Sequence, residues 1–225
     1  MGKRGKGRPK TPQWKKLAAS VAAAVTVGAG GVGIYKNLPY FIGERVRYVI
    51  DGDTVVLENS QSIKLYGVDA PEPENCYGAE ATAYLKKLLT GKRVFLREPV
   101  TDQYRRIVAL VYLDRKLVNE MVIRDGYGFF TRAAESATQV MQEANKYARE
   151  KAIGIYGPEC YQKDPPNPKC AIKGNLDRDK KVWTYLTPGC SYYDVSIVEK
   201  FKGERWFCSE AEAIKAGYTK HGYCK

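Results

Sequence analysis

Short runs of apolar residues, many of them Val, Ile or Leu, alternate with polar turns along much of the chain. The runs that we interpret as strands occupy residues 45–50, 54–58, 62–68, 93–100 and 106–114. The stretches DGD and ENSQS separate the first three runs, and a polar turn around residues 102–105 separates the last two. Branched apolar runs bounded by such turn residues are typical of β-strands. The pattern therefore predicts short strands joined by tight turns.

Three other stretches repeat apolar residues every three or four positions, as one face of an α-helix requires. They cover residues 77–92, 117–126 and 133–152. The apolar face of the third stretch is predicted to consist of Val140, Met141, Ala144, Tyr147 and Ala148. The order of strands, helix, strands, helix and helix lacks regular β–α–β alternation. It predicts an α+β fold in which a small antiparallel barrel carries the helices.

The start of the chain has a different composition. Residues 1–16 hold seven Lys or Arg and no acid, and residues 17–35 carry no charge. As a helix, this uncharged segment would be about 28 Å long, close to the thickness of a bilayer core. Because the positive charges precede it, we expect a cytoplasmic tail, a membrane anchor and an extracytoplasmic remainder. The alternative is a signal peptide cleaved near residues 27–29, which would give a secreted protein.

Net charge and histidine content limit which partners and which catalytic residues the protein can use. The formal net charge of the 225-residue chain is +12, which fits a polyanionic partner but also fits a surface rich in solvated lysines. The chain has one histidine, His221, which is the fifth residue from the end of the sequence. A His-based triad or a His-rich metal site in the main domain is therefore excluded. Acid–base chemistry falls to carboxylates, Lys, Tyr or Arg.

Carboxylates gather among the first strands, although the chain as a whole is basic. They are Asp51, Asp53, Asp69, Glu72 and Glu74. The DGD turn leaves Asp53 at the start of one strand, and Asp69 ends another. Two carboxylates at neighbouring strand ends form a hard-oxygen site suited to calcium or magnesium. Glu72 follows on a loop, near enough to orient or deprotonate a water.

Positive residues complete the set. Lys64 lies five residues before Asp69, and Arg105 and Arg106 lie in the turn TDQYRRIVALVY. They are suited to hold a phosphate and to stabilise charge in a transition state. Together with the acids they predict metal-assisted phosphodiester hydrolysis without histidine.

The order of these motifs resembles one known family. VIDGDTVVL, IKLYGVDAPE, YGAEATAYLKKLL, TDQYRRIVALVY, LVNEMVIRDGY and GIYG resemble the staphylococcal (thermo)nuclease family, over about residues 45–157. The resemblance implies an OB-fold, a five-stranded β-barrel with three helices. It also implies a calcium-dependent endonuclease that acts on DNA and RNA and leaves 3′-phosphate ends.

The resemblance also implies residue roles. Asp53 and Asp69 match calcium ligands, and Ala70 falls where the family supplies a main-chain carbonyl. Glu72 matches the proposed general base, and Arg106 matches the second catalytic arginine.

Three positions in this region concern the substrate phosphate and nucleotide. Tyr104 matches a tyrosine at the nucleotide pocket. Lys64 stands where the family has its first catalytic arginine, which is a departure, since lysine lacks the two parallel donors of a guanidinium. Arg105 stands where the family usually has glycine, so we expect strain at a turn position with positive φ. Our hypothesis is that Arg105 partly replaces the missing guanidinium.

The C-terminal part is rich in Tyr and Cys. A proline-rich linker, 159–168, separates the nuclease-like domain, 44–158, from a module at 169–225 that is too small to bury much core alone. The aromatic side chains of the module, which we expect to form its core or alternatively to stack on bases or glycans, are Trp183, Tyr185, Tyr192, Tyr193 and Trp206. A short helix is predicted after Ser209 as N-cap, with Glu212 three residues on and Gly217 behind it.

Six cysteines favour disulfides in an exported chain. By resemblance to exported relatives, Cys76 pairs with Cys160; two free thiols are the alternative. For the other four cysteines, Cys170, Cys190, Cys208 and Cys224, we expect two disulfides of unassigned pairing, with structural zinc as the alternative. The module resembles one that follows such nucleases, but Leu186 stands where that module has a histidine, which weakens the zinc interpretation.

The sequence thus predicts a monomeric calcium-dependent nuclease, tethered to a membrane or secreted, with DNA and RNA as partners. The alternative is an OB-fold module that binds nucleic acid with little or no catalysis, which the Lys64 substitution favours. The retained acids argue against that alternative, because a pure binder gains nothing from carboxylates that repel phosphate.

Overall fold

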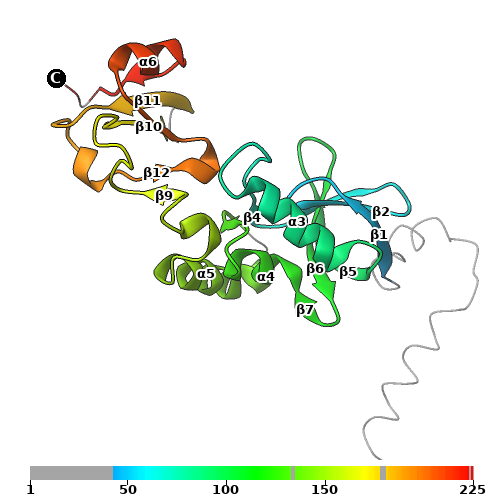
Figure 1. Ribbon diagram of the computed structural model, residues 1–225. Coiled ribbons are helices and arrows are strands. Elements are labelled where there is room, and N and C mark those ends of the chain that lie inside the picture. Colours follow the sequence, from blue (N-terminus) through cyan, green and yellow to red (C-terminus); the bar gives the residue numbers. More distant parts are fainter. Residues whose placement is uncertain (1–42, 133–134, 178–180, 223, 225) are drawn as a thin grey trace, which may run out of the picture. The chain divides into compact units, whose positions relative to one another are not determined.

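The computed structural model describes residues 43–132, 135–177, 181–222 and 224, and all of these belong to the unit Tyr40–Lys225 (Figure 1). The predicted basic tail and the predicted hydrophobic segment, 1–16 and 17–35, lie outside the described residues. Among the helices that are described, none combines the length and the apolar character needed to cross a bilayer.

A closed barrel forms the first half of the described chain. Its strands are β1 (Glu44–Val49), β2 (Thr54–Leu57), β3 (Ser62–Leu65), β5 (Arg93–Thr101) and β6 (Ile107–Leu113). They are ordered β3-β2-β1-β5-β6, and an added β3–β6 pairing closes the barrel. The short strand β7 (Lys116–Leu117) pairs antiparallel with the end of β6. The five-stranded barrel of an OB-fold is confirmed. The closing β3–β6 pair is parallel, however, so the expectation of a purely antiparallel barrel was wrong in this pair.

The barrel interior explains the apolar runs of the sequence. All four residues of β2 are buried, and β5 alternates buried Val94 and Leu96 with exposed neighbours. The parallel pairing of Ile63 with Ile107 brings together strands that are separated by about forty residues. A closed barrel leaves no free edge among its strands, so each short strand has partners on both sides.

Three helices cover the barrel: α3 (Gly78–Leu89), α4 (Val118–Arg124) and α5 (Glu135–Glu150), with α4 and α5 side by side (Figure 1). On α5 the predicted residues Met141, Ala144 and Ala148 are buried, but Val140 and Tyr147 are exposed. The buried stripe follows steps of three and four residues and is narrower than predicted. Tyr147 flanks the stripe, where the Arg124 guanidinium lies over its ring.

A buried asparagine joins α4 to the barrel. The Asn119 amide donates to the carbonyl oxygens of Tyr66 and Ala109, and its Oδ1 accepts from the Val111 N–H at 2.8 Å. The Ala109 carbonyl also accepts from the Tyr66 N–H at 2.9 Å, so Asn119 joins a backbone contact that links β6 to the residue after β3. Asn119 therefore fixes the start of α4 against β6 and the end of β3.

The C-terminal module contains a four-stranded sheet. Its strands are ordered β13 (Arg205–Phe207), β10 (Ile172–Asp177), β11 (Val182–Leu186) and β14 (Thr219–Lys220). The short helix α6 (Glu210–Lys215) begins where predicted, because the Ser209 hydroxyl accepts from the Glu212 N–H. The remaining 3-10 turns are η1 (Gly154–Tyr156), η2 (Tyr193–Val195) and η3 (Lys200–Lys202).

Most of the predicted aromatic residues contribute to packing in the module. Tyr185 is buried in its core, and Trp183 packs against that core. The Trp206 indole donates to Gln162, and the Tyr193 hydroxyl donates to the Ala171 carbonyl. Tyr192 is exposed. The core interpretation therefore holds for Tyr185 and Trp183, whereas Tyr193 and Trp206 are half-buried and hydrogen-bonded outside that core cluster.

Three disulfides are formed within the described residues. Cys76 is bonded to Cys160, as the resemblance implied. The other two bonds are Cys170–Cys208 and Cys190–Cys224. These four sulfurs are therefore engaged in disulfides, which removes them as thiolate ligands for zinc.

Strand pairing, a backbone hydrogen bond and apolar packing hold the module against the nuclease-like fold. Two residues in the predicted linker form strand β9 (Tyr161–Gln162), which pairs with β12 (Val198–Glu199). The Lys200 N–H also donates to the Cys160 carbonyl at 2.8 Å. Phe201 from the module packs in one buried cluster with residues of α5 and η1, namely Ala148, Ile155 and Tyr156.

Candidate active site

The DGD turn places Asp53 at the entrance to β2. The Asp53 N–H donates to the Asp51 carboxylate at 3.0 Å, which is the local bond of an Asx-turn. Gly52 permits the turn to lie close to its neighbours, since an added Cβ would come within 2.6 Å of Ala70. The sequence therefore holds the Asp53 carboxylate at a defined point, where only 4% of the residue is exposed.

Three hydrogen bonds converge on this carboxylate. Its Oδ1 accepts from the Thr54 hydroxyl at 2.8 Å, and its Oδ2 accepts from the Ala70 N–H at 3.0 Å. The same Oδ2 accepts from the Lys64 ammonium at 2.6 Å. Three of the roughly four acceptor sites of the carboxylate are thus occupied, and its orientation is set by β2, β3 and the end of β4 (Val68–Asp69).

Lys64 lies between the two predicted metal ligands. Its Nζ is 2.6 Å from Asp53 Oδ2 and 3.4 Å from Asp69 Oδ1. Asp69 is half-exposed at the end of β4, which pairs with β8 (Phe129–Phe130). The structure therefore brings together Asp53, Asp69 and Lys64, three residues that the sequence predicted as one site.

Burial and neighbouring charges both shift the pKa values of the cluster. Burial raises the pKa of Asp69, and the attraction of Lys64 offsets this only in part. Burial, followed by the charges of Asp51 and Glu74, raises the pKa of Glu72. Burial opposes the charged form of Lys64, but Asp53 and Asp69 outweigh it and raise the pKa of the ammonium. The acids thus favour any positive charge that approaches them.

The donor set fits a calcium or magnesium ion. Asp53 and Asp69 direct carboxylate oxygens towards one positive group, the Lys64 ammonium, and hard cations prefer such oxygens. Ala70, whose main-chain carbonyl is a predicted ligand, follows Asp69, and its N–H donates to Asp53. Among the described residues, no group of three or more His, Cys, Asp or Glu could hold a metal. An ion here would therefore take its other ligands from water and phosphate.

The Asp102–Arg106 turn presents the predicted substrate residues. Arg105 has a φ of 61°, the left-handed region where the family pattern has glycine. Tyr104 is 70% exposed, and the Arg106 guanidinium lies 5.3 Å from the centre of its ring. The turn therefore offers an exposed aromatic side chain beside a cation, although Arg105 adopts a backbone conformation that costs a non-glycine residue about 1 kcal/mol.

Asp102 holds Arg106, a role that the sequence reasoning missed. The Arg106 Nε donates to Asp102 Oδ2 at 2.9 Å, and the N–H groups of Tyr104 and Arg106 donate to Oδ1. The detectable signal was Asp102 at the start of a tight turn, because an Asp side chain there typically accepts the N–H two residues on in an Asx-turn.

Strand register relates Arg106 to the acids. The parallel pairing sets Ile63 opposite Ile107 and Lys64 opposite Val108. Because side chains alternate along a strand, Arg106 and Lys64 belong to the same face of neighbouring strands. The register thus relates Arg106 to Lys64, but in the described part of the chain the Arg106 guanidinium is ion-paired with Asp102 and not with Asp53 or Asp69.

Comparison with known proteins agrees with the fold. A sequence profile described as staphylococcal nuclease homologue matches residues 62–157. A thermonuclease of Staphylococcus hyicus is 31% identical over 125 residues, which cover 50% of this chain and 74% of that relative. A micrococcal nuclease of Shigella flexneri is 30% identical over 153 residues, 61% of this chain and 87% of that relative. An uncharacterized protein of Bacillus anthracis is 33% identical over 127 residues, 50% of this chain and 59% of that relative.

The barrel with its helices and acidic cluster thus defines an OB-fold protein of the nuclease type. The chain belongs to the staphylococcal nuclease homologue family.

Proposed function

We propose that the chain is a calcium-dependent endonuclease that hydrolyses phosphodiester bonds of DNA and RNA and leaves 3′-phosphate and 5′-hydroxyl ends. The observation that carries this proposal is the convergence of Asp53 and Asp69 on one cation position, with Glu72 on the adjoining loop. Nuclease relatives of the same family support the reaction class.

Each residue has a distinct role in the proposed reaction. Glu72 orients a water and takes up its proton as the water oxygen bonds to phosphorus. The bond from phosphorus to the 5′ oxygen breaks, and that oxygen takes a proton from solvent water and leaves as a hydroxyl, while Glu72 releases its proton to solvent. Lys64 and Arg106 hold the phosphate and stabilise its added charge, while Asp102 positions Arg106. Calcium, bound by Asp53, Asp69 and the Ala70 carbonyl, would neutralise phosphate charge.

Glu72→Gln tests the proposed base. We expect this change to lower kcat for single-stranded DNA by about a hundredfold or more, because a neutral amide cannot accept the proton. Glu74→Gln is the matched control, since Glu74 lies on the same loop and contributes a similar charge. Equal losses in the two variants would mean that charge on the loop, and not a base at position 72, supports cleavage.

Lys64→Arg tests the departure from the family pattern. A guanidinium can keep a bond to Asp53 and offer a second donor to the phosphate, so we expect kcat to rise between several-fold and about a hundredfold. Melting temperatures of both proteins, measured without metal, control for altered packing around Asp53. An unchanged or lower kcat in a normally folded variant would contradict this assignment.

A location outside the cytoplasm is part of the proposal. Three disulfides support it, because such bonds persist in oxidising compartments. Residues 17–35 would act as the anchor or the export signal. Recovery of the full-length chain from the cytosolic fraction of expressing cells, with its cysteines reduced, would contradict this location.

A further inference from the structure

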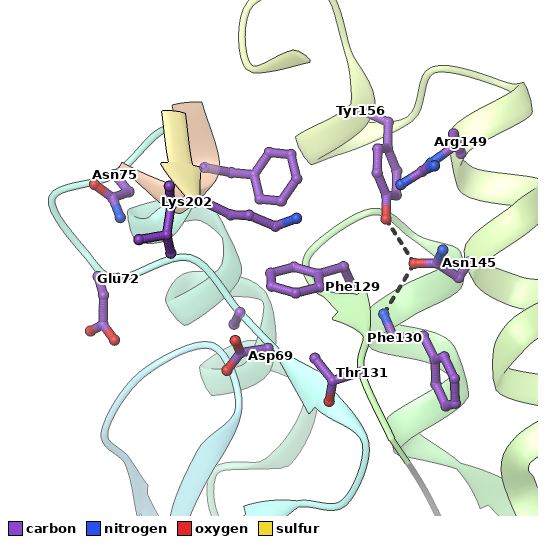
Figure 2. A pocket seen from close by; sticks show the side chains of 13 residues that line it. Asp69, Glu72, Asn75, Phe129, Phe130, Thr131, Asn145, Arg149, Tyr156 and Lys202 are labelled. Carbon is purple, nitrogen blue, oxygen red and sulfur yellow. Dashed lines mark hydrogen bonds between the residues drawn. The ribbon is translucent and has the colours of Figure 1, made fainter. Parts of the chain in front are cut away.

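A cavity of about 560 Å³ adjoins the acidic cluster, and both halves of the protein line it. Asp69 and Glu72 lie at one end, Arg149 and Tyr156 at the other, and Leu176 and Lys202 come from the C-terminal module. Figure 2 shows Lys202 reaching into this space beside Phe129, with Arg149 and Tyr156 across from it. A volume between about 300 and 1,000 Å³ is usual for a pocket that holds a small ligand. None of the lining residues belongs to the Asp102–Arg106 turn.

Two cations face this cavity. The Lys202 ammonium is 2.6 Å from the buried Glu199 carboxylate and 4.6 Å from the centre of the Phe129 ring. Its charge also reaches Asp69, where it counteracts part of the rise that burial causes in the pKa of that carboxyl. The Arg149 guanidinium lies 5.1 Å from the Tyr156 ring and 5.7 Å from the Tyr161 ring. Within the described part of the chain, Arg149 forms no ion pair with a carboxylate.

Aromatic rings and amides complete the lining. Phe201 contacts both Phe129 and Tyr156, with ring centres 5.5 and 5.8 Å apart. Asn145 Oδ1 accepts from the Phe130 N–H and the Tyr156 hydroxyl, and these two bonds fix the side chain at the cavity wall (Figure 2). A ligand that suits this lining has an anionic part and an apolar planar part. A nucleotide has both.

We propose that this cavity is a nucleotide subsite that holds the nucleotide next to the scissile phosphate of a single-stranded substrate. The base packs against the aromatic rings, and a backbone phosphate lies near Arg149 and Lys202. Cationic grooves with interspersed aromatic side chains are the usual means of holding single strands. A paired base cannot enter a pocket, so the subsite also favours single strands over duplexes. The inference rests on the proposed nuclease function, and it gives the C-terminal module a part in substrate binding.

Binding without cleavage tests the subsite. The full-length protein in chelator is titrated into a fluorescently labelled octathymidylate, and anisotropy gives Kd. Arg149→Gln removes the guanidinium charge but keeps most of the stem, and we expect Kd to rise about tenfold. Arg124→Gln is the matched control, because Arg124 also lies over a tyrosine ring but outside the cavity. We expect its Kd to stay within about twofold of the unchanged protein.

Leu176→Trp tests the same cavity from the module side. The larger side chain fills space that the base would occupy, so we expect a similar rise in Kd with an unchanged melting temperature. Adenosine 5′-monophosphate should displace the octathymidylate at lower concentration than inorganic phosphate does. The proposal would be overturned if Arg149→Gln and Leu176→Trp both bound the octathymidylate as tightly as Arg124→Gln does. It would also be overturned if adenosine 5′-monophosphate and inorganic phosphate displaced the octathymidylate equally well. Failure of the unchanged protein to cut, with both variants still weakened in binding, would contradict the nuclease function and leave the subsite supported.

Discussion

Asp53→Asn is expected to abolish calcium-dependent cleavage, with kcat at least about a hundredfold below that of the unchanged protein. Asparagine keeps the shape of the side chain and removes its charge. Lys64 and the Ala70 N–H would then donate to a neutral amide oxygen in place of a carboxylate. Since two carboxylates form the whole charged part of the predicted ion site, losing one removes half of its negative charge.

Calcium binding separates this expectation from a general loss of structure. Calorimetric titration of Asp53→Asn should show little or no calcium binding at concentrations that saturate the unchanged protein. Asp114→Asn is the control, because Asp114 lies in the turn after β6 with a φ of 47°, a conformation that asparagine tolerates. Calcium-dependent cleavage within tenfold of normal in Asp53→Asn would show that Asp53 is not a calcium ligand.

Removal of the Cys76–Cys160 disulfide has the largest expected effect on stability. The bond closes a loop with a sequence separation of 84, so loop-closure entropy predicts a loss of about 4.5 kcal/mol in the free energy of unfolding at 25 °C. It links the segment before α3 to the segment after η1, where Cys160 is buried against Phe201. Glu72 lies on the loop that leads to Cys76, so kcat should fall as well.

Urea unfolding of the Cys76→Ser/Cys160→Ser double variant measures this loss. The Cys190→Ser/Cys224→Ser double variant is the control, because its bond closes a shorter loop, with a separation of 34, inside the C-terminal module. Its cleavage rate should stay near normal. A loss below about 1 kcal/mol in the first variant would mean that packing around Phe201 already holds the two segments together.

The sequence predicted the parts of the fold that depend on local pattern. Strands and helices followed from apolar periodicity, and Asp53, Lys64 and Asp69 met because a few tight turns join their strands. The exposure of Val140 and Tyr147 was missed, because periodicity alone does not show how wide a stripe the neighbouring helix covers. Parallel closure of the barrel was also missed, since it pairs strands that are distant in the chain.

The disulfide pairing and the cations beside the cavity depend on contacts between residues that are distant in the sequence. The pairing of four cysteines allows three connectivities, and nothing local selects among them. Lys202 and Arg149 reach the cavity beside Asp69 only because β9 pairs with β12 and Phe201 packs against η1. No motif in the sequence connects these two cations with the acids.

The most direct test is a time course of 5′-labelled single-stranded DNA with the full-length protein, in calcium, in excess chelator, and in chelator followed by added calcium. The proposed function predicts internal cleavage with calcium, loss of cleavage in chelator, recovery on re-addition, and products that end in 3′-phosphate. Intact DNA in every condition, together with salt-sensitive binding, would contradict it and show that the domain binds nucleic acid without cutting it.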